Sequence, residues 1–377
     1  MQAYKKRGFW VGLGVFFLVL LSPNPESLSP IGWAVAAVTL LMAIWWATEA
    51  VPVAVTALLP LALFPLLQVT DFKAAALPYA NPNIYLFMGG FILALGIESS
   101  GLHKRLALKM LILVGNSGAK LVGGFMLVSA VISMWVMNTS TTLMLLPIGL
   151  AVCTSVAETI PNFSAKQRKN FETSLLLGIA YAASIGGMST LVGTAPNIIF
   201  VGFMQETYGI EISFIDWMKL GVPIASIMLV ASWYTITQFV YPVNFVASME
   251  TKLQLRNMLT DLGPLGRDEK KVLVIFLFAA GAWMFRTLLD NFVPLSGLTD
   301  AGIAILAALS FFFIPSENNK TDLLTWEQAN KLPWGLLVLF GGGLSLAASI
   351  GSSGLGSWIG QGLTVLENVP PIVLILA

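Results

Sequence analysis

The chain has 377 residues, of which 56% are hydrophobic and only 10% are charged, and its mean hydropathy is +0.82. A soluble domain carries about 25% charged residues, so this composition excludes an ordinary soluble protein and predicts an all-α membrane protein with several spans. The net charge of +1 gives no reason to expect a nucleic-acid partner, and the single cysteine, Cys153, excludes an intrachain disulfide.

The N-terminal region, residues 1–30, begins with Lys5, Lys6 and Arg7 before a short apolar run. This pattern resembles a secretory signal peptide, but the residues that follow, SPNPESLSP, contain no A-x-A cleavage site. We therefore interpret residues 8–21 as an uncleaved first span.

Apolar stretches long enough to cross the bilayer continue along the chain, since a helical span needs about 20 residues. With the first span, the predicted set is 8–21, 31–48, 51–68, 83–102, 173–200, 218–246, 272–290, 299–315 and 335–358. Glu49, between the second and third spans, is expected at a helix end near the membrane interface. A further apolar stretch, 120–153, is interrupted near its middle by polar residues.

One sixteen-residue segment occurs twice. Residues 87–102 read FMGGFILALGIESSGL, and residues 340–355, offset by 253, read FGGGLSLAASIGSSGL, with ten identical positions. Repeats with inverted topology are typical of secondary transporters, whose substrate site lies where the two repeats meet.

Basic residues give the direction of each span. If 120–153 enters and leaves on one face, a single side of the membrane holds seventeen of the twenty Lys and Arg. The segments on that side are 1–7, 103–120, 154–172, 248–271 and 316–334. The positive-inside rule makes this side cytoplasmic, with the N-terminus inside. A single crossing at 120–153 would split the basic residues between the two faces, so this stretch is a hairpin, and its 34 residues favour a re-entrant one.

In this topology the two copies of the repeat cross the membrane in opposite directions. The predicted organisation is a first inverted repeat over 31–246, a cytoplasmic or interfacial linker over 247–271 and an incomplete second inverted repeat over 272–377. Within the first repeat lie the hairpin 120–153 and a broken helix over 173–200.

The centre of the hairpin is polar. It reads SMWVMNTSTT from Ser133, so five hydroxyls and one amide fall within ten residues. Lipid penalises unpaired polar groups, and non-helical backbone at this depth is tolerated only where protein buries it or it lines a watery cavity. A helix broken at Asn138–Thr142 would offer carbonyls and hydroxyls to sodium, and a helix N-terminus to an anion.

A second irregular patch, SIGGMSTLVGTAPN, covers residues 184–197. Pro196 removes a backbone donor and Gly193 permits the chain to leave the helix, which predicts a second break with free carbonyls. Neither patch contains Arg or Lys, so an anionic substrate would be met by helix dipoles, hydroxyls and co-transported cations. Arg286 and Asp290 are spaced i,i+4 and predict a structural ion pair, and His103 is expected to be an interfacial cation.

At these patches the sequence resembles the divalent anion/sodium symporter family. The matching segments are NTSTTLMLLPIG, YAASIGGMSTLVGTAPNII, WWATEAVPVAVTALLPL and the FMGG repeat, which cover most of residues 45–200. The resemblance implies a sodium-coupled carrier of C4-dicarboxylates such as succinate, malate and fumarate. It also implies a homodimer in the lipid bilayer of the cell membrane, working by an elevator mechanism.

The resemblance also assigns roles to residues. Asn138 and Thr139 would contact a substrate carboxylate, and Thr194 would face the substrate. Ser133, Asn138, the carbonyl of Met137 and the backbone of Gly193 would hold a sodium ion, Na⁺. Members of the family carry two Ser-Asn-Thr motifs, one at the tip of each of two opposed hairpins.

Two departures from the family pattern stand out. Met137 replaces the serine of the first motif, which removes a hydroxyl from the site. The repeat offset would place the second motif near position ~391, beyond Ala377, and ENVPPIVLILA at 367–377 resembles the start of the second hairpin. We therefore expect the chain to hold the first half of a binding site.

The sequence thus predicts an inverted-repeat secondary transporter of the elevator type, with a re-entrant helical hairpin and broken helices. It predicts no enzyme, because no nucleophile–base pair or metal-ligand cluster lies in the spans. Two alternatives stay open: a sodium-independent dicarboxylate exchanger, and a truncated, non-transporting remnant of the same family.

Overall fold

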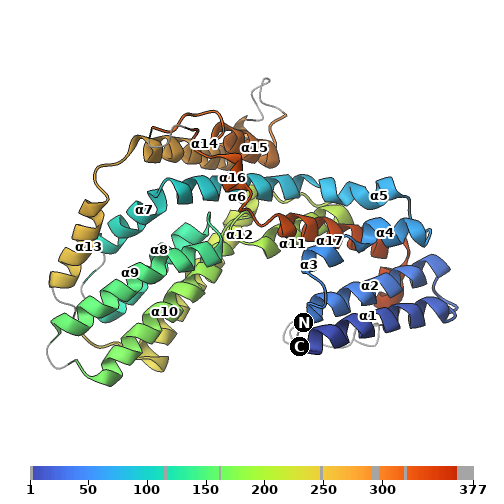
Figure 1. The fold of residues 1–377 in the computed structure, drawn as a ribbon, viewed down its shortest axis with the longest axis horizontal. Coiled ribbons are helices and arrows are strands. Elements are labelled where there is room, and N and C mark those ends of the chain that lie inside the picture. The colour runs from blue at the N-terminus through green and yellow to red at the C-terminus, as the bar shows by residue number, and fades with distance from the viewer. Residues whose placement is uncertain are drawn as a thin grey trace. The chain divides into compact units, whose positions relative to one another are not determined.

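The computed structural model describes residues 3–113, 115, 117–160, 163–246, 249–289, 297–317 and 321–362. Within these ranges the regular elements are helices (Figure 1), and extended pairing is limited to two isolated bridges, Ser117–Val246 and Pro315–Asp322. Five helical segments are long and apolar enough to cross a membrane: Pro30–Thr48, Phe72–Ser99, Asn138–Thr159, Phe214–Val240 and Trp334–Ser352. The all-helical membrane class predicted from composition is confirmed.

The helices form two compact units. One unit comprises residues 1–84, 199–211 and 333–377, and the other comprises residues 85–198 and 212–332. We refer to them as the first and second units.

The first unit draws on both ends of the chain. Its helices are α1 (Ala3–Leu21), α2 (Pro30–Thr48), α3 (Val53–Thr56), α4 (Leu59–Leu66), α5 (Phe72–Ala76), the 3₁₀ turn η1 (Leu77–Ala80), α17 (Trp334–Ser352) and α18 (Leu355–Gly362). It also holds the beginning of α6 (Pro82–Ser99) and the end of α11 (Ala195–Tyr208).

Local sequence explains where these helices start and stop. The Ser29 hydroxyl accepts a hydrogen bond from the Gly32 N–H, and Pro30 occupies the first turn of α2, as suits a helix start. Glu49 ends α2 in a left-handed conformation with φ 45° and pairs with Lys5 at 2.8 Å. The predicted position of Glu49 at a helix end is therefore correct.

The stretch 51–68 is not the single span that its hydropathy predicts. It forms the short helices α3 and α4, separated at residues 57–58. Pro52 lies directly before α3, and Pro60 lies in the first turn of α4. Because proline cannot donate to the preceding turn, each helix begins at its proline rather than continuing from the residues before it.

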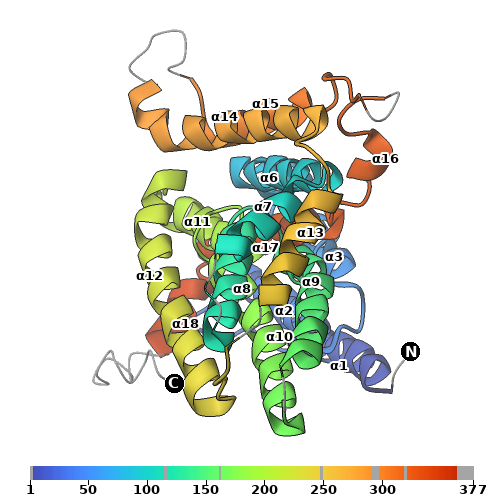
Figure 2. The same ribbon diagram turned by 90° about the vertical axis from the view of Figure 1, so that its left-hand side faces the viewer.

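The second unit contains the remainder of α6 and α11, and ten further helical elements among the described residues. These are α7 (Leu102–Leu113), α8 (Gly118–Ser133), α9 (Asn138–Thr159), α10 (Ala165–Gly187), α12 (Phe214–Tyr234), the π-helix η2 (Thr235–Val240), α13 (Met249–Asp261), α14 (Arg267–Leu289), α15 (Asp300–Ser310) and α16 (Trp326–Ala329). The π-helix η2 continues α12 directly. Helices α8, α9 and α10 lie side by side in both views of the ribbon (Figures 1 and 2).

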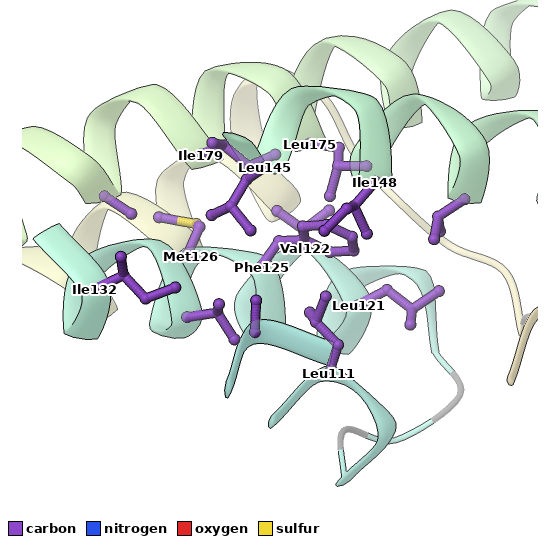
Figure 3. Close-up of a cluster of buried hydrophobic side chains, with 14 of the residues drawn as sticks. Leu111, Leu121, Val122, Phe125, Met126, Ile132, Leu145, Ile148, Leu175 and Ile179 are labelled. Carbon is purple, nitrogen blue, oxygen red and sulfur yellow. The ribbon is translucent and has the colours of Figure 1, made fainter. Parts of the chain in front are cut away.

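The core of the second unit lies among α8, α9 and α10 (Figure 3). Phe125 and Val122 of α8 are fully buried against Leu145 of α9 and Leu175 of α10. Gly186 of α10 meets α8 closely, since a Cβ there would collide with the backbone of Ala130. Burying four such side chains stabilises the bundle by roughly 1.5–3 kcal/mol each, which fixes the ends of α8 and α10 next to each other.

The two copies of the repeated segment are the helices α6 and α17. Gly89 of α6 packs against Ala304 of α15, where a Cβ would lie 2.6 Å from the alanine Cβ. Gly342, at the corresponding position of α17, packs against Ala57, directly after α3, where a Cβ would collide with the carbonyl oxygen. Each copy therefore packs against a segment from the other half of the sequence.

Candidate functional site

Two helix breaks meet in the second unit. The first, residues 134–137, joins α8 to α9 at the tip of the hairpin, and the second, residues 188–194, joins α10 to α11. Pro196 lies in the first turn of α11, where a missing N–H costs no helical hydrogen bond. The structure thus places both breaks within the two polar patches of the sequence. The first break precedes the predicted position, since Asn138–Thr142 form the start of α9.

Side-chain oxygens at the hairpin tip bond to one another and to the turn. The Ser133 hydroxyl donates to Oδ1 of Asn138 at 2.7 Å, and Ser133 is fully buried. The hydroxyls of Ser133 and Thr141 both lie 3.4 Å from the Val136 carbonyl oxygen. Thr142 donates to the Asn138 carbonyl at 2.8 Å. These bonds satisfy the polar groups of a hairpin tip that is buried at Ser133 and Thr141 and half-buried at Asn138 and Thr142.

The second break is held by Asn197 and Thr190. Nδ2 of Asn197 donates to the carbonyl oxygens of Gly187 at 2.9 Å and Thr190 at 2.7 Å. The Thr190 hydroxyl accepts from the Gly193 N–H at 3.1 Å and donates to the carbonyl of Met134. Because Met134 belongs to the first break, the Thr190 hydroxyl ties the two breaks together.

Where the breaks meet, oxygen atoms of four residues lie close together, and we call this group the oxygen cradle: Ser133, Asn138, Gly187 and Gly193. A Cβ on Gly187 would lie 2.5 Å from Oδ1 of Asn138 and 3.2 Å from the Gly193 carbonyl oxygen. A Cβ on Gly193 would lie 2.5 Å from the Gly187 carbonyl oxygen and 3.0 Å from that of Ser133. Glycine at both positions therefore permits this close approach of the oxygen atoms.

The donor set of the oxygen cradle suits a sodium ion. Its atoms are a hydroxyl, an amide oxygen and backbone carbonyls, and all of them are neutral. Unwound backbone carbonyls at a discontinuous helix are the usual ligands of sodium in secondary transporters. A hard monovalent cation can be held this way without a carboxylate, whose burial in the membrane would be costly.

Three of the residues expected to bind sodium lie in the oxygen cradle: Ser133, Asn138 and Gly193. The carbonyl of the fourth, Met137, accepts the Thr141 N–H at 2.9 Å in the first hydrogen bond of α9, and the Met137 side chain is half-buried. Of the residues expected to contact substrate, Thr139 is exposed on the first turn of α9.

Thr194, the other residue expected to face substrate, is half-buried as the last residue before α11, and its carbonyl accepts the Asn197 N–H at 3.3 Å. Thr139 and Thr194 thus both lie at helix N-termini, where the helix dipole favours an anion.

A pocket of about 140 Å³ lies beside the hairpin tip. Its lining residues are Val136, Met137 and Ser140 of the hairpin, Phe91, Ala94, Leu95 and Glu98 of α6, and Lys331 and Leu332. The two polar patches contain no basic residue, but folding brings the Lys331 side chain to the same pocket as Met137. Lys331 is about 190 residues from Met137 in the sequence, so the local sequence pattern could not predict that the two residues line one pocket.

Thr190 and Asn197 hold the second break, but the sequence predicted no individual role for either residue. Both are buried, at 0% and 6% exposure, within a run rich in glycine. A hydroxyl and an amide at membrane depth need partners, and this requirement is the signal that could have identified them.

Arg286 and His103 have partners that the sequence did not predict. Arg286 pairs with Asp300 at 3.3 Å, and its predicted partner Asp290 lies outside the described residues. His103 is buried, and its Nδ1 lies 2.9 Å from the Ile97 carbonyl oxygen. Burial lowers the pKa of His103 below its usual value of 6.5, which favours the neutral ring over the expected cation. The predicted start of a second hairpin, 367–377, also lies outside the described residues.

The sequence matches the sodium:sulfate symporter transmembrane region over residues 6–377. The chain belongs to this family. A sodium-dependent dicarboxylate transporter, SdcS, of Staphylococcus saprophyticus is 40% identical over 377 residues, which cover 98% of this chain and 72% of the relative. The SdcS proteins of Staphylococcus aureus strains USA300 and NCTC 8325 are each 38% identical over 375 residues, with the same coverage.

Membership of the sodium:sulfate symporter family confirms three predictions. The family is the one that the polar patches resemble, the chain is a membrane transporter rather than an enzyme, and Na⁺ is the co-transported ion. The neutral oxygens of the oxygen cradle have the chemistry that such an ion requires.

Proposed function

We propose that this symporter imports C4-dicarboxylates such as succinate, malate and fumarate, and that the sodium gradient drives the import. The observation that carries the proposal is the oxygen cradle, in which neutral oxygens of Ser133, Asn138, Gly187 and Gly193 converge between two helix breaks. The names of the SdcS relatives supply the substrate class.

In this proposal sodium and substrate bind next to each other. A sodium ion in the oxygen cradle, with the Met137 carbonyl as a further ligand, places a positive charge close to the start of α9. The N-termini of α9 and α11 add the positive ends of two helix dipoles. One substrate carboxylate would then bind Asn138 and Thr139, with Thr194 facing the same anion. Because the two charges attract, each ligand strengthens the binding of the other, which couples their transport.

We further propose that the chain contains two inverted repeats and moves its substrate by an elevator mechanism. Gly89 and Gly342 occupy corresponding positions in the two copies, and each packs closely against a small residue of the other half, Ala304 or Ala57. Such reciprocal packing is expected if the halves are related by pseudo-symmetry, as in other inverted-repeat transporters. The repeat boundaries at 31–246 and 272–377 belong to this proposal.

The proposed setting is the cell membrane, with the N-terminus in the cytoplasm and two copies forming a homodimer. The orientation rests on the seventeen basic residues that share one side in the predicted topology. Helix α12 exposes a row of large apolar side chains, including Leu220, Ile227 and Val230, as a helix in contact with lipid would.

The test is uptake of labelled succinate into proteoliposomes under an inward sodium gradient. We expect uptake to require sodium, and Asn138→Ala to abolish it. Asn170→Ala is the matched control, because Asn170 is an amide on α10 that bonds the Pro242 carbonyl, away from the oxygen cradle. Uptake that survives Asn138→Ala would overturn the site assignment.

Two other outcomes would favour the alternatives. Uptake that requires internal dicarboxylate and ignores the sodium gradient would identify a sodium-independent exchanger. Absence of transport, with no thermal stabilisation by sodium or succinate at millimolar concentrations, would identify a non-transporting member of the family.

A further inference from the structure

The first two turns of α12 contact the second helix break. Nε1 of Trp217 donates to the Met188 carbonyl oxygen at 2.9 Å, and Met188 is the residue at which α10 ends. One turn later, a Cβ on Gly221 would lie 2.8 Å from the Met188 carbonyl oxygen and 3.0 Å from that of Ser189. Trp217 and Gly221 together set how closely the break approaches α12.

The same end of α12 also contacts the hairpin tip. The ring of Phe214, the first residue of α12, stacks on Trp135 with centroids 5.8 Å apart and an angle of 19° between the planes. Trp135 lies between Met134 and Val136, whose carbonyls accept the hydroxyl hydrogen bonds of the first break. Phe214 is fully buried, so this contact cannot shift without repacking its neighbours.

The N-terminus of α12 is itself held in place. The Asp300 carboxylate accepts the Phe214 N–H at 3.0 Å, and its backbone carbonyl accepts Nε1 of Trp283 at 3.0 Å. The Trp283 ring stacks on Phe214 at 4.6 Å and 10°, and Arg286 pairs with Asp300. The segment that reaches both breaks is therefore anchored to α14 and α15 rather than to the breaks alone.

We propose that the first two turns of α12 hold the two breaks at the spacing that sodium binding requires, with Trp217 and Phe214 as positioning residues. Neither residue belongs to the oxygen cradle. Trp217 fixes the Met188 carbonyl next to Gly187 of the oxygen cradle. Phe214 fixes Trp135 next to Met134, whose carbonyl accepts the Thr190 hydroxyl that ties the two breaks together. This inference rests on the proposed sodium site.

The test measures sodium affinity separately from substrate affinity. The unfolding temperature of purified protein is titrated with sodium in the absence of substrate, and the KM for succinate uptake is measured at saturating sodium. Trp217→Phe keeps the aromatic bulk and removes one hydrogen bond, so it should raise the half-saturating sodium concentration roughly 3- to 10-fold. The KM at saturating sodium should stay within about twofold of its original value.

Matched controls lie on the same helix and on a neighbouring one. Trp233 of α12 donates its Nε1 to the Ala119 carbonyl at 2.8 Å, far along the helix from the breaks, so Trp233→Phe should leave sodium affinity unchanged. Gly221→Ala should weaken sodium binding, whereas Gly281→Ala in α14, where a Cβ would meet nothing within 4 Å, should not.

The outcomes separate this inference from the proposed function. If the unaltered protein shows no stabilisation by sodium, the proposed sodium site fails. If sodium stabilises the unaltered protein and Ser133→Ala removes the effect, but Trp217→Phe leaves sodium affinity unchanged, the positioning role of α12 is wrong. An equal loss of affinity in Trp233→Phe would also overturn it.

Discussion

Gly187 lies so close to Asn138 that a Cβ on residue 187 would come within 2.5 Å of the asparagine Oδ1. This contact joins the last residue of α10 to the first residue of α9, and these two residues border the two different helix breaks. A methyl group at position 187 would collide with the Asn138 Oδ1 and lie 3.2 Å from the Gly193 carbonyl oxygen. The close approach of these oxygens is therefore a testable property of the site.

Gly187→Ala should abolish sodium-dependent uptake, because the added methyl group displaces Asn138 or fills the cation position. We expect a loss of at least tenfold in uptake rate, with the protein still folded. Gly14→Ala in α1, where a Cβ would meet nothing within 4 Å, is the control and should transport normally. Sodium activation that is unchanged in Gly187→Ala would show that the cation binds elsewhere.

Thr190→Val should destabilise the protein and weaken sodium binding together. Valine is close to threonine in shape but lacks the hydroxyl that bonds both the Met134 carbonyl and the Gly193 N–H. Leaving these buried groups unpaired lowers the free energy of unfolding by about 1–3 kcal/mol. Thr190→Ser keeps the hydroxyl and should restore both properties. Thermal unfolding in detergent, with and without sodium, measures the two effects, and equal behaviour of the Val and Ser variants would contradict the bridging role.

Arg105→Ala should lower thermal stability strongly. Arg105 pairs with Glu269 at 2.9 Å with both side chains at or below 10% exposure, and it donates to the carbonyls of Leu262, Gly263 and Pro264. Removing one partner of a buried pair costs about 3–5 kcal/mol, because the other charge is left unpaired. The exposed pair Arg267–Glu317 is the comparison, since Arg267→Ala breaks a solvent-screened contact and should change stability little. Similar unfolding temperatures for the two variants would refute this ranking.

The sequence could predict the two polar patches in which the breaks lie, because their causes are local, although the first break lies at residues 134–137 rather than at Asn138–Thr142. A helix is weakened locally by Asn138 with its neighbouring hydroxyls, and by Gly193 with Pro196. This effect does not depend on what the helix packs against. A local cause also acts at residues 51–68, where hydropathy predicts one span. Pro52 lies directly before α3 and Pro60 lies in the first turn of α4, so the stretch forms two short helices.

The partners of the site could not be predicted, because they are distant in sequence. Thr190 bonds a carbonyl 56 residues away, and Arg105 pairs across 164 residues. Trp217 and Lys331 show no pattern that links them to the patches, and only packing brings them there. Arg286 pairs with Asp300, fourteen residues further along the chain, which the i,i+4 spacing did not predict; its predicted partner Asp290 lies outside the described residues.

Membrane orientation can be tested with single cysteines, because the native Cys153 is buried and can be replaced first. Lys73→Cys and Lys219→Cys should react from outside intact cells with a membrane-impermeant maleimide, since both positions are exposed and predicted to lie outside. Lys104→Cys and Lys166→Cys are equally exposed but should react only after the membrane is opened. The reverse pattern would place the N-terminus outside the cell.

The most direct test of the central claim is a sodium titration of thermal stability in the purified protein and in Ser133→Ala. Ser133 supplies a fully buried hydroxyl to the oxygen cradle. We predict that sodium, but not potassium, raises the unfolding temperature of the unaltered protein, and that Ser133→Ala removes this rise. An equal rise with both cations, or a rise that persists in Ser133→Ala, would contradict a sodium site at the meeting of the two helix breaks.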